Sequence, residues 1–106
     1  MTRLEWTDPA VADLQHIHDY IARDSPQYAV SLVERLITSA ERIKSFPESG
    51  RRVPEASDPK ARELLVERYR VIYRLKKGTA QVLAVVHGAR NLPGTKLRPW
   101  ARHRPQ

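Results

Sequence analysis

The sequence predicts an α+β domain in which a helical hairpin packs on one face of a single sheet. Three observations lead to this fold class. The chain has 106 residues, enough for one two-layer core. Its apolar residues follow a helical period in the first half and a strand period in the second. The elements therefore occur in the order strand, helix, helix, strand, strand, strand, and the last three form an antiparallel meander.

The chain begins with a short strand and a helix. Residues 2–6 alternate apolar and charged side chains, which is typical of a strand. The pair Asp8-Pro9 then resembles a helix start, with Asp8 as the N-cap and proline in the first turn. Apolar residues at helical spacing predict an amphipathic helix from residue 9 to about residue 23.

A second, longer helix follows almost at once. Ser25-Pro26 repeats the start signal, and the apolar period continues to about Phe46-Pro47. The connection between the helices is short, so they should form an antiparallel hairpin.

Residues 47–60 contain three prolines and Gly50, which predicts a loop. After it the period becomes strand-like, and two tight turns separate three strands at residues 61–66, 69–75 and 80–87. The last strand is apolar on both faces, which indicates a central strand covered on two sides. The first strand has no neighbour in sequence, and we expect it at an edge or beside a later strand.

The middle strand has two different faces. One face carries Tyr69, Val71, Tyr73 and Leu75; the other carries Arg70, Ile72, Arg74 and Lys76. The predicted core lies between hairpin and sheet and contains Leu14, Ile17, Leu32, Leu36, Tyr73 and Val85.

Charge is distributed unevenly. Residues 1–50 hold five basic and eight acidic side chains, whereas residues 51–106 hold fourteen basic and four acidic ones. Such a cationic half favours a polyanion or an acidic protein as partner. Residues 92–106 contain no acid and three prolines, and we expect a basic tail after a domain that spans residues 1–91.

Several classes of site are not expected. The chain has no cysteine, which excludes disulfides and zinc–thiolate sites and fits a reducing cytoplasm. No apolar run is long enough to span a membrane, and no secretory signal is visible. His16 and His18 are two apart on a helix and do not share a face, so no metal site is predicted. The sequence has no glycine-rich phosphate loop, and no cofactor is expected.

Several short blocks occur here in an order that resembles the RelE/ParE toxin superfamily of bacterial toxin–antitoxin systems. They cover most of the chain and are Trp6, Ala12-Asp13-Leu14 with Ile17, Tyr20-Ile21-Ala22, Ser25-Pro26, Phe46-Pro47, Gly50-Arg51, Arg62-Glu63-Leu64, Tyr69-Arg70-Val71-Ile72-Tyr73-Arg74 and Val85-Val86-His87-Gly88-Ala89-Arg90.

The resemblance implies two activities. RelE-like members cut ribosome-bound messenger RNA, whereas ParE-like members bind DNA gyrase and trap it on cleaved DNA. Residues 69–74 and 87–90 are more similar to the ParE branch, and we expect a gyrase inhibitor without catalytic residues. The partners implied are gyrase and a ParD-like antitoxin, which wraps the toxin in a hetero-oligomer and carries it to operator DNA. A RelE-like nuclease and an inactive member that acts only in a repressor complex remain alternatives.

The nuclease alternative needs a base, cations for the phosphorane and an acid. The nearest candidates are Glu67 as base, Arg70 and Arg74 as cations, and His87 as acid. Arg70 and Arg74 lie on one strand face about 13 Å apart, which suits a long anionic ligand better than one phosphate. RelE-like nucleases often place a further aromatic or basic residue of the site beyond the last strand. Here no tyrosine follows residue 73, and Trp100 and His103 lie far into a proline-rich segment, so this departure weakens the nuclease hypothesis.

For the ParE-like reading we expect partner contacts from cations of the second half. The candidates are Arg51, Arg52, Arg70, Arg74, His87, Arg90, Arg98 and Arg102.

Overall fold

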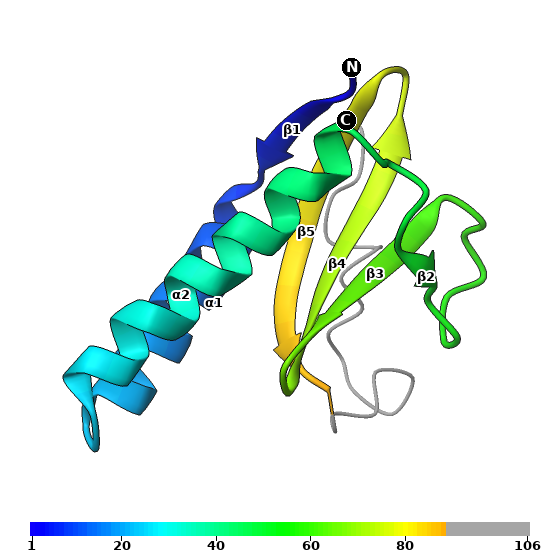
Figure 1. Ribbon diagram of the computed structural model, residues 1–106. Coiled ribbons are helices and arrows are strands. Elements are labelled where there is room, and N and C mark those ends of the chain that lie inside the picture. Colours follow the sequence, from blue (N-terminus) through cyan, green and yellow to red (C-terminus); the bar gives the residue numbers. More distant parts are fainter. Residues whose placement is uncertain (89–106) are drawn as a thin grey trace.

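In the computed structural model, which describes residues 1–88, one sheet carries a helical hairpin on one of its faces (Figure 1). The predicted α+β class and order of elements are confirmed. The elements are β1 (Arg3–Trp6), α1 (Asp8–Ala22), α2 (Pro26–Glu41), the 3₁₀ helix η1 (Arg42–Lys44), β2 (Arg51–Arg52), β3 (Ala61–Val66), β4 (Tyr69–Lys76) and β5 (Thr79–His87).

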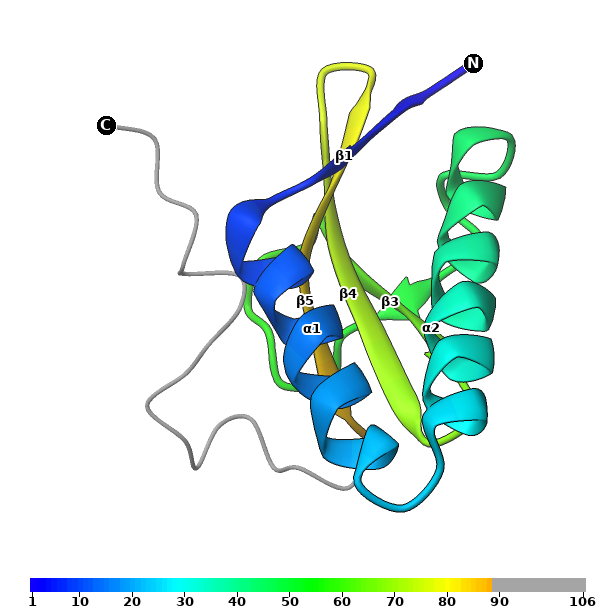
Figure 2. The same cartoon turned by 90° about the vertical axis from the view of Figure 1, so that its left-hand side faces the viewer.

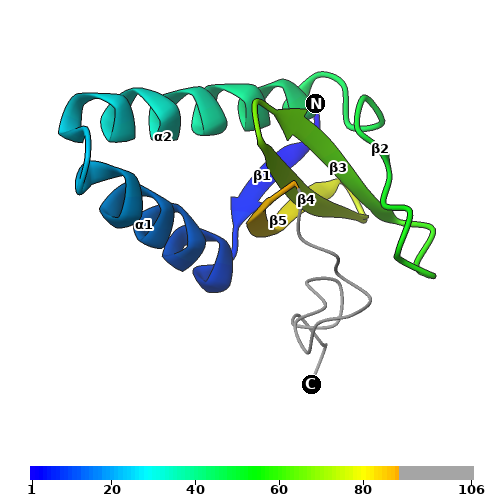
Figure 3. The same ribbon diagram turned by 90° about the horizontal axis from the view of Figure 1, so that it is seen from below.

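The strands lie in the order β1-β5-β4-β3-β2. Strands β3, β4 and β5 form the predicted antiparallel meander, and β1 lies at an edge beside β5. Because β1 runs parallel to β5, the sheet is mixed. Figures 2 and 3 show both helices on the same side of this sheet.

Helix α1 begins one residue earlier than predicted. Its N-cap is Thr7 and not Asp8. Asp8 lies in the first turn, where its negative charge interacts favourably with the helix dipole. The Thr7 hydroxyl does not cap the helix. It donates a hydrogen bond to the carbonyl oxygen of Val82 at 2.6 Å, so that Thr7 ties the start of α1 to β5.

Helix α2 begins as predicted. Its N-cap is Ser25, whose hydroxyl accepts a hydrogen bond from the backbone N–H of Tyr28 at 3.2 Å. The α-helix ends at Glu41, earlier than the apolar period indicated, and one 3₁₀ turn, η1, continues it. The buried Ile43 in that turn explains why the period extends beyond the helix.

A bulge in β5 was not predicted. Ile72 pairs with Ala84 but Tyr73 pairs with Val82, so Leu83 has no residue opposite it on β4. The extra residue changes which side chains face the helices. Val82 and Val85 both join the core beneath the hairpin, while Ala84 joins a smaller cluster on the opposite face. The uninterrupted apolar run is therefore buried on two faces, as predicted.

The main core lies between the hairpin and the sheet. Leu14, Leu32, Leu36, Tyr73 and Val85 are buried in it as predicted, and Ile17 packs against it while partly exposed. The cluster on the opposite face contains Val53, Ala61, Ile72, Ala84 and Val86.

Leu36→Ala should lower the free energy of unfolding by about 2–5 kcal/mol, because Leu36 is fully buried and truncation leaves a cavity. Urea denaturation measures the effect. The neighbouring Ile37 is 40% exposed, and Ile37→Ala is the control, with an expected loss below about 1 kcal/mol. Equal losses in the two variants would contradict the helix phase.

The loop predicted at residues 47–60 contains the short strand β2. Arg51 and Arg52 pair with Glu63 and Arg62 and form the edge of the sheet, so they do not lie in an irregular loop. The segment before them is held by the buried Tyr73, whose hydroxyl donates to the carbonyl of Pro47 and accepts from the N–H of Gly50. A Cβ at Gly50 would lie 2.6 Å from that hydroxyl, which explains the glycine.

Candidate functional site

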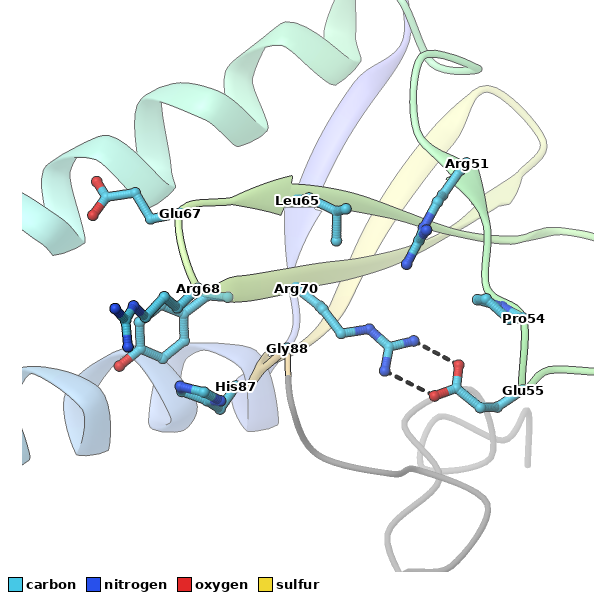
Figure 4. A pocket seen from close by; sticks show the side chains of 10 residues that line it. Arg51, Pro54, Glu55, Leu65, Glu67, Arg68, Arg70, His87 and Gly88 are labelled. Atoms are coloured by element: carbon cyan, nitrogen blue, oxygen red, sulfur yellow. Dashed lines mark hydrogen bonds and ion pairs between the residues drawn. The ribbon is translucent and has the colours of Figure 1, made fainter.

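A shallow groove lies where the β3–β4 turn meets the end of β5. Its volume is about 560 Å³. Figure 4 shows the side chains that surround it. They come from β2 and the segment after it, from β3, from the turn and from the two central strands, and are Arg51, Pro54, Glu55, Leu65, Glu67, Arg68, Tyr69, Arg70, His87 and Gly88. The groove therefore brings together four of the predicted site residues: Arg51, Glu67, Arg70 and His87.

Arg70 is buried at the inner side of the groove. Its side chain is only 5% exposed and donates a 2.6 Å hydrogen bond from Nε to Glu63. The guanidinium also forms two hydrogen bonds with Glu55, at 2.6 and 2.8 Å. The bonds to Glu55 and Glu63 raise the pKa of Arg70. Arg70 was expected to contact a partner, and in this structure two carboxylates of the chain itself already neutralise its charge.

Glu63 joins a second arginine to this cluster. Its carboxylate is 0% exposed and accepts a 2.6 Å hydrogen bond from Nε of Arg51 on the neighbouring strand β2. Arg51, Glu55, Glu63 and Arg70 thus form a network of two cations and two anions. Burial of a charge is tolerated only with such partners. The Arg51 side chain remains 56% exposed, so one cation of the network faces solvent.

Glu67 is held by the hairpin and does not face His87. It lies in the β3–β4 turn at φ 54°, a conformation that is unfavourable for a residue with a Cβ. Its carboxylate accepts a 2.9 Å hydrogen bond from the Tyr28 hydroxyl and forms an ion pair with Arg35. Figure 4 shows its side chain directed toward α2. The bonds from Arg35 and Tyr28 lower the pKa of Glu67, which makes it a weaker base.

His87 and Arg68 form the exposed rim of the groove. The His87 ring packs edge-on against Tyr69, with ring centroids 5.5 Å apart. Burial raises the pKa of Tyr69, so its hydroxyl is a weak acid. Among residues 1–88 the Arg68 side chain has no ion-pair partner. Between this rim and Arg51 lies Leu65, an apolar side chain that is 57% exposed.

The other predicted cations lie elsewhere. Arg74 is on β4 but does not line the groove, and it forms an ion pair with Asp58 at 3.2 Å. Arg52 is exposed on β2, also outside the lining. Arg90, Arg98 and Arg102, with the predicted tail at residues 92–106, lie outside the described residues.

The arrangement suits binding better than proton transfer. The groove offers an exposed arginine, an exposed apolar side chain and an aromatic pair, whereas the candidate base is occupied by Arg35. No role for Arg68, Leu65 or Glu55 was evident from the sequence pattern. One sequence signal pointed to the network. By strand alternation Glu63 lies on the same face of β3 as the buried Ala61, which is an inward position for an acidic residue. Within residues 1–88 no group of acidic or histidine side chains could hold a metal ion, and no helix is long and apolar enough to cross a bilayer.

The Glu67 ion pair should make stability depend on pH in the acid range. Because its pKa is lowered in the folded state, its contribution is present at neutral pH and is lost as pH falls below its usual value of 4.5. The urea midpoint of wild type should exceed that of Glu67→Gln at pH 7, and the difference should shrink as the pH falls below 4.5. Glu34→Gln, which removes another carboxylate near α2 Arg35, is the control. A midpoint difference that stays constant over this range would contradict the assignment.

Comparisons with known proteins agree with this fold. Residues 4–92 match the family model described as ParE toxin of the type II toxin–antitoxin system parDE. Toxin RelE2 from Caulobacter vibrioides is 35% identical over 91 residues, which cover 85% of this chain and 99% of the relative.

Solved structures are similar as well. A chain of the chromosomal ParDE toxin–antitoxin system from P. aeruginosa has a TM-score of 0.70 at 27% identity and covers 82% of this chain and 96% of its own. A chain of the toxin–antitoxin complex RelBE2 from Mycobacterium tuberculosis shares the fold alone, with a TM-score of 0.55 at 19% identity over 81% of this chain and 96% of its own.

Proposed function

This chain belongs to the ParE toxin family of type II toxin–antitoxin systems, and from that membership we propose that it inhibits DNA gyrase by protein–protein contact. The observation that carries the proposal is the state of Glu67. A nuclease needs a free base near the scissile bond, and here the candidate base is paired with Arg35 and Tyr28. The other side chains of the groove can bind a partner protein, and such binding requires no proton transfer.

The gyrase contact in this proposal is the outer part of the groove. Arg68 supplies an exposed charge, and Leu65 supplies apolar surface that a partner can bury. An arginine beside an apolar side chain is a common core of protein interfaces.

An antitoxin is the second proposed partner, since the solved neighbours belong to toxin–antitoxin systems. Its acidic and apolar segments would dock across the sheet face and the hairpin. A second hollow of about 530 Å³ continues from the groove toward the hairpin and is lined by Ile21, Tyr28, Leu32, Glu67, Arg68 and Tyr69. It offers apolar walls for a side chain of such a segment.

His87→Ala and Glu67→Ala should leave growth arrest on induction within a few fold of wild type. A gyrase inhibitor transfers no proton, whereas a RelE-like nuclease should lose about 10²–10⁴-fold with each. Circular dichroism is the control for folding. Abolished arrest in a folded His87→Ala variant would favour the nuclease alternative, and absence of arrest in wild type would favour a member that acts only in a repressor complex.

A further inference from the structure

The segment between β2 and β3, here called the acidic loop (residues 53–60), covers both arginines on the outer face of β4. Glu55 binds the guanidinium of Arg70 at 2.6 and 2.8 Å, and Asp58 lies 3.2 Å from Nε of Arg74. These are the two acids of the loop. Each acid therefore neutralises one of the cations that the sequence places on this face.

The loop has the form of an acidic peptide bound to a cationic strand. Arg70 and Arg74 lie four residues apart, about 13 Å along β4. Glu55 and Asp58 lie three residues apart and reach one arginine each. A separate polypeptide segment with similarly spaced carboxylates would match the same two cations.

The ion pairs made by the loop can be exchanged more readily than those made by the sheet. Glu63, which binds the inner side of Arg70, is 0% exposed and fixed on β3. Glu55 binds the outer side and is 17% exposed. The contact of Asp58 with Arg74 lacks hydrogen-bond geometry, since Arg74 Nε is buried without an acceptor in the described residues.

Backbone hydrogen bonds attach the loop mainly at its ends. The N–H of Val53 donates to Ala61, and the N–H of Ala61 donates to Asp58. The N–H of Ala56 donates back to Val53 within the loop. Its central part is thus held to the sheet largely by the Val53 and Ala56 side chains and by the two ion pairs.

We propose that the acidic loop is an internal competitor of the antitoxin: an acidic antitoxin segment displaces Glu55 and Asp58 and places its own carboxylates on Arg70 and Arg74. The proposal rests on the proposed neutralisation by an antitoxin. An acidic peptide is the expected ligand of the arginine pair because the loop already places peptide carboxylates on both arginines.

The test uses a fluorescein-labelled peptide with two Glu-Ala-Ser-Asp repeats, titrated against the full chain by fluorescence anisotropy at low salt. Glu55→Gln/Asp58→Asn should bind it about tenfold more tightly than wild type, because two competing carboxylates are gone. Asp24→Asn/Glu34→Gln is the matched control. It removes the same charge from the exposed hairpin and should change the affinity less than about twofold. Equal gains in both variants, or no gain in a folded loop variant, would overturn the proposal.

Two further measurements test whether the peptide displaces the loop and whether the site prefers a peptide to other polyanions. In wild type, the bound peptide should speed hydrogen exchange at the hydrogen-bonded amides of Ala56 and Lys60; amides that stay protected with peptide bound would refute displacement. A single-stranded DNA of about 12 nucleotides should gain little from the loop substitutions, and a gain equal to that of the peptide would assign the site to polyanions in general. Neither measurement involves gyrase, so a chain inactive on gyrase would still give a clear answer.

Discussion

Arg68→Glu combined with Leu65→Glu should abolish gyrase inhibition, raising the concentration of toxin needed for half inhibition by about 100-fold or more. Both side chains are exposed at the proposed contact, and both would present a negative charge to the surface that binds an arginine. Unpaired charge in an interface costs enough binding energy to produce a loss of this size. The measurement is supercoiling by purified gyrase at increasing toxin concentration.

The control makes the same two kinds of substitution, arginine to glutamate and an apolar residue to glutamate, at another exposed surface. Arg23→Glu with Val30→Glu places two acids on the exposed surface of the hairpin, away from the groove. It should inhibit gyrase within about threefold of wild type. Equal losses in the two double variants would indicate that net charge, and not the groove, determines binding.

Glu63→Ala should lower the free energy of unfolding by about 3–5 kcal/mol. The substitution removes a fully buried carboxylate that binds both Arg51 and Arg70, and it leaves Arg70 buried with half of its partners. Breaking one side of a buried ion pair is among the most destabilising single changes. Such a loss is a large part of the stability of a small domain. Urea denaturation at neutral pH measures it.

An exposed ion pair gives the comparison. Glu41 binds Lys44 at 2.7 Å with both side chains well exposed, and Glu41→Ala should cost about 0.5 kcal/mol or less. A loss below about 1 kcal/mol for Glu63→Ala would contradict the view that the four-residue network holds β2 and the acidic loop to the sheet.

Most of the fold could be predicted from local signals. Ser25 at a helix start, the switch of period near residue 60 and the turn at Gly78 each act over a few residues. Where the structure differs from the sequence-based predictions, the difference arises from a contact between residues that are far apart in the sequence. Thr7 occupies the N-cap position of α1 in place of Asp8, and its hydroxyl donates a hydrogen bond to the carbonyl of Val82, 75 residues away. The bulge at Leu83 and the pairing of Arg51 with Glu63 also depend on neighbouring strands.

The candidate site could be predicted only in part, for a related reason. Residue type and alternation placed Arg70 and Arg74 on one face of β4, and that placement agrees with their partners on the same side. Whether an arginine is exposed or paired depends on which acids the loop brings to it, and the spacing from Glu55 to Arg70 carries no such signal. Glu67 likewise pairs with Arg35, 32 residues earlier, because the turn meets α2 only in the folded domain.

Inhibition of gyrase is tested most directly by a parallel assay of the purified chain on DNA gyrase and on ribosome-bound messenger RNA. We expect that the chain inhibits supercoiling, that cleaved DNA accumulates with gyrase, and that the message stays intact. Cleavage of the message with supercoiling unaffected would contradict the account and establish the nuclease alternative.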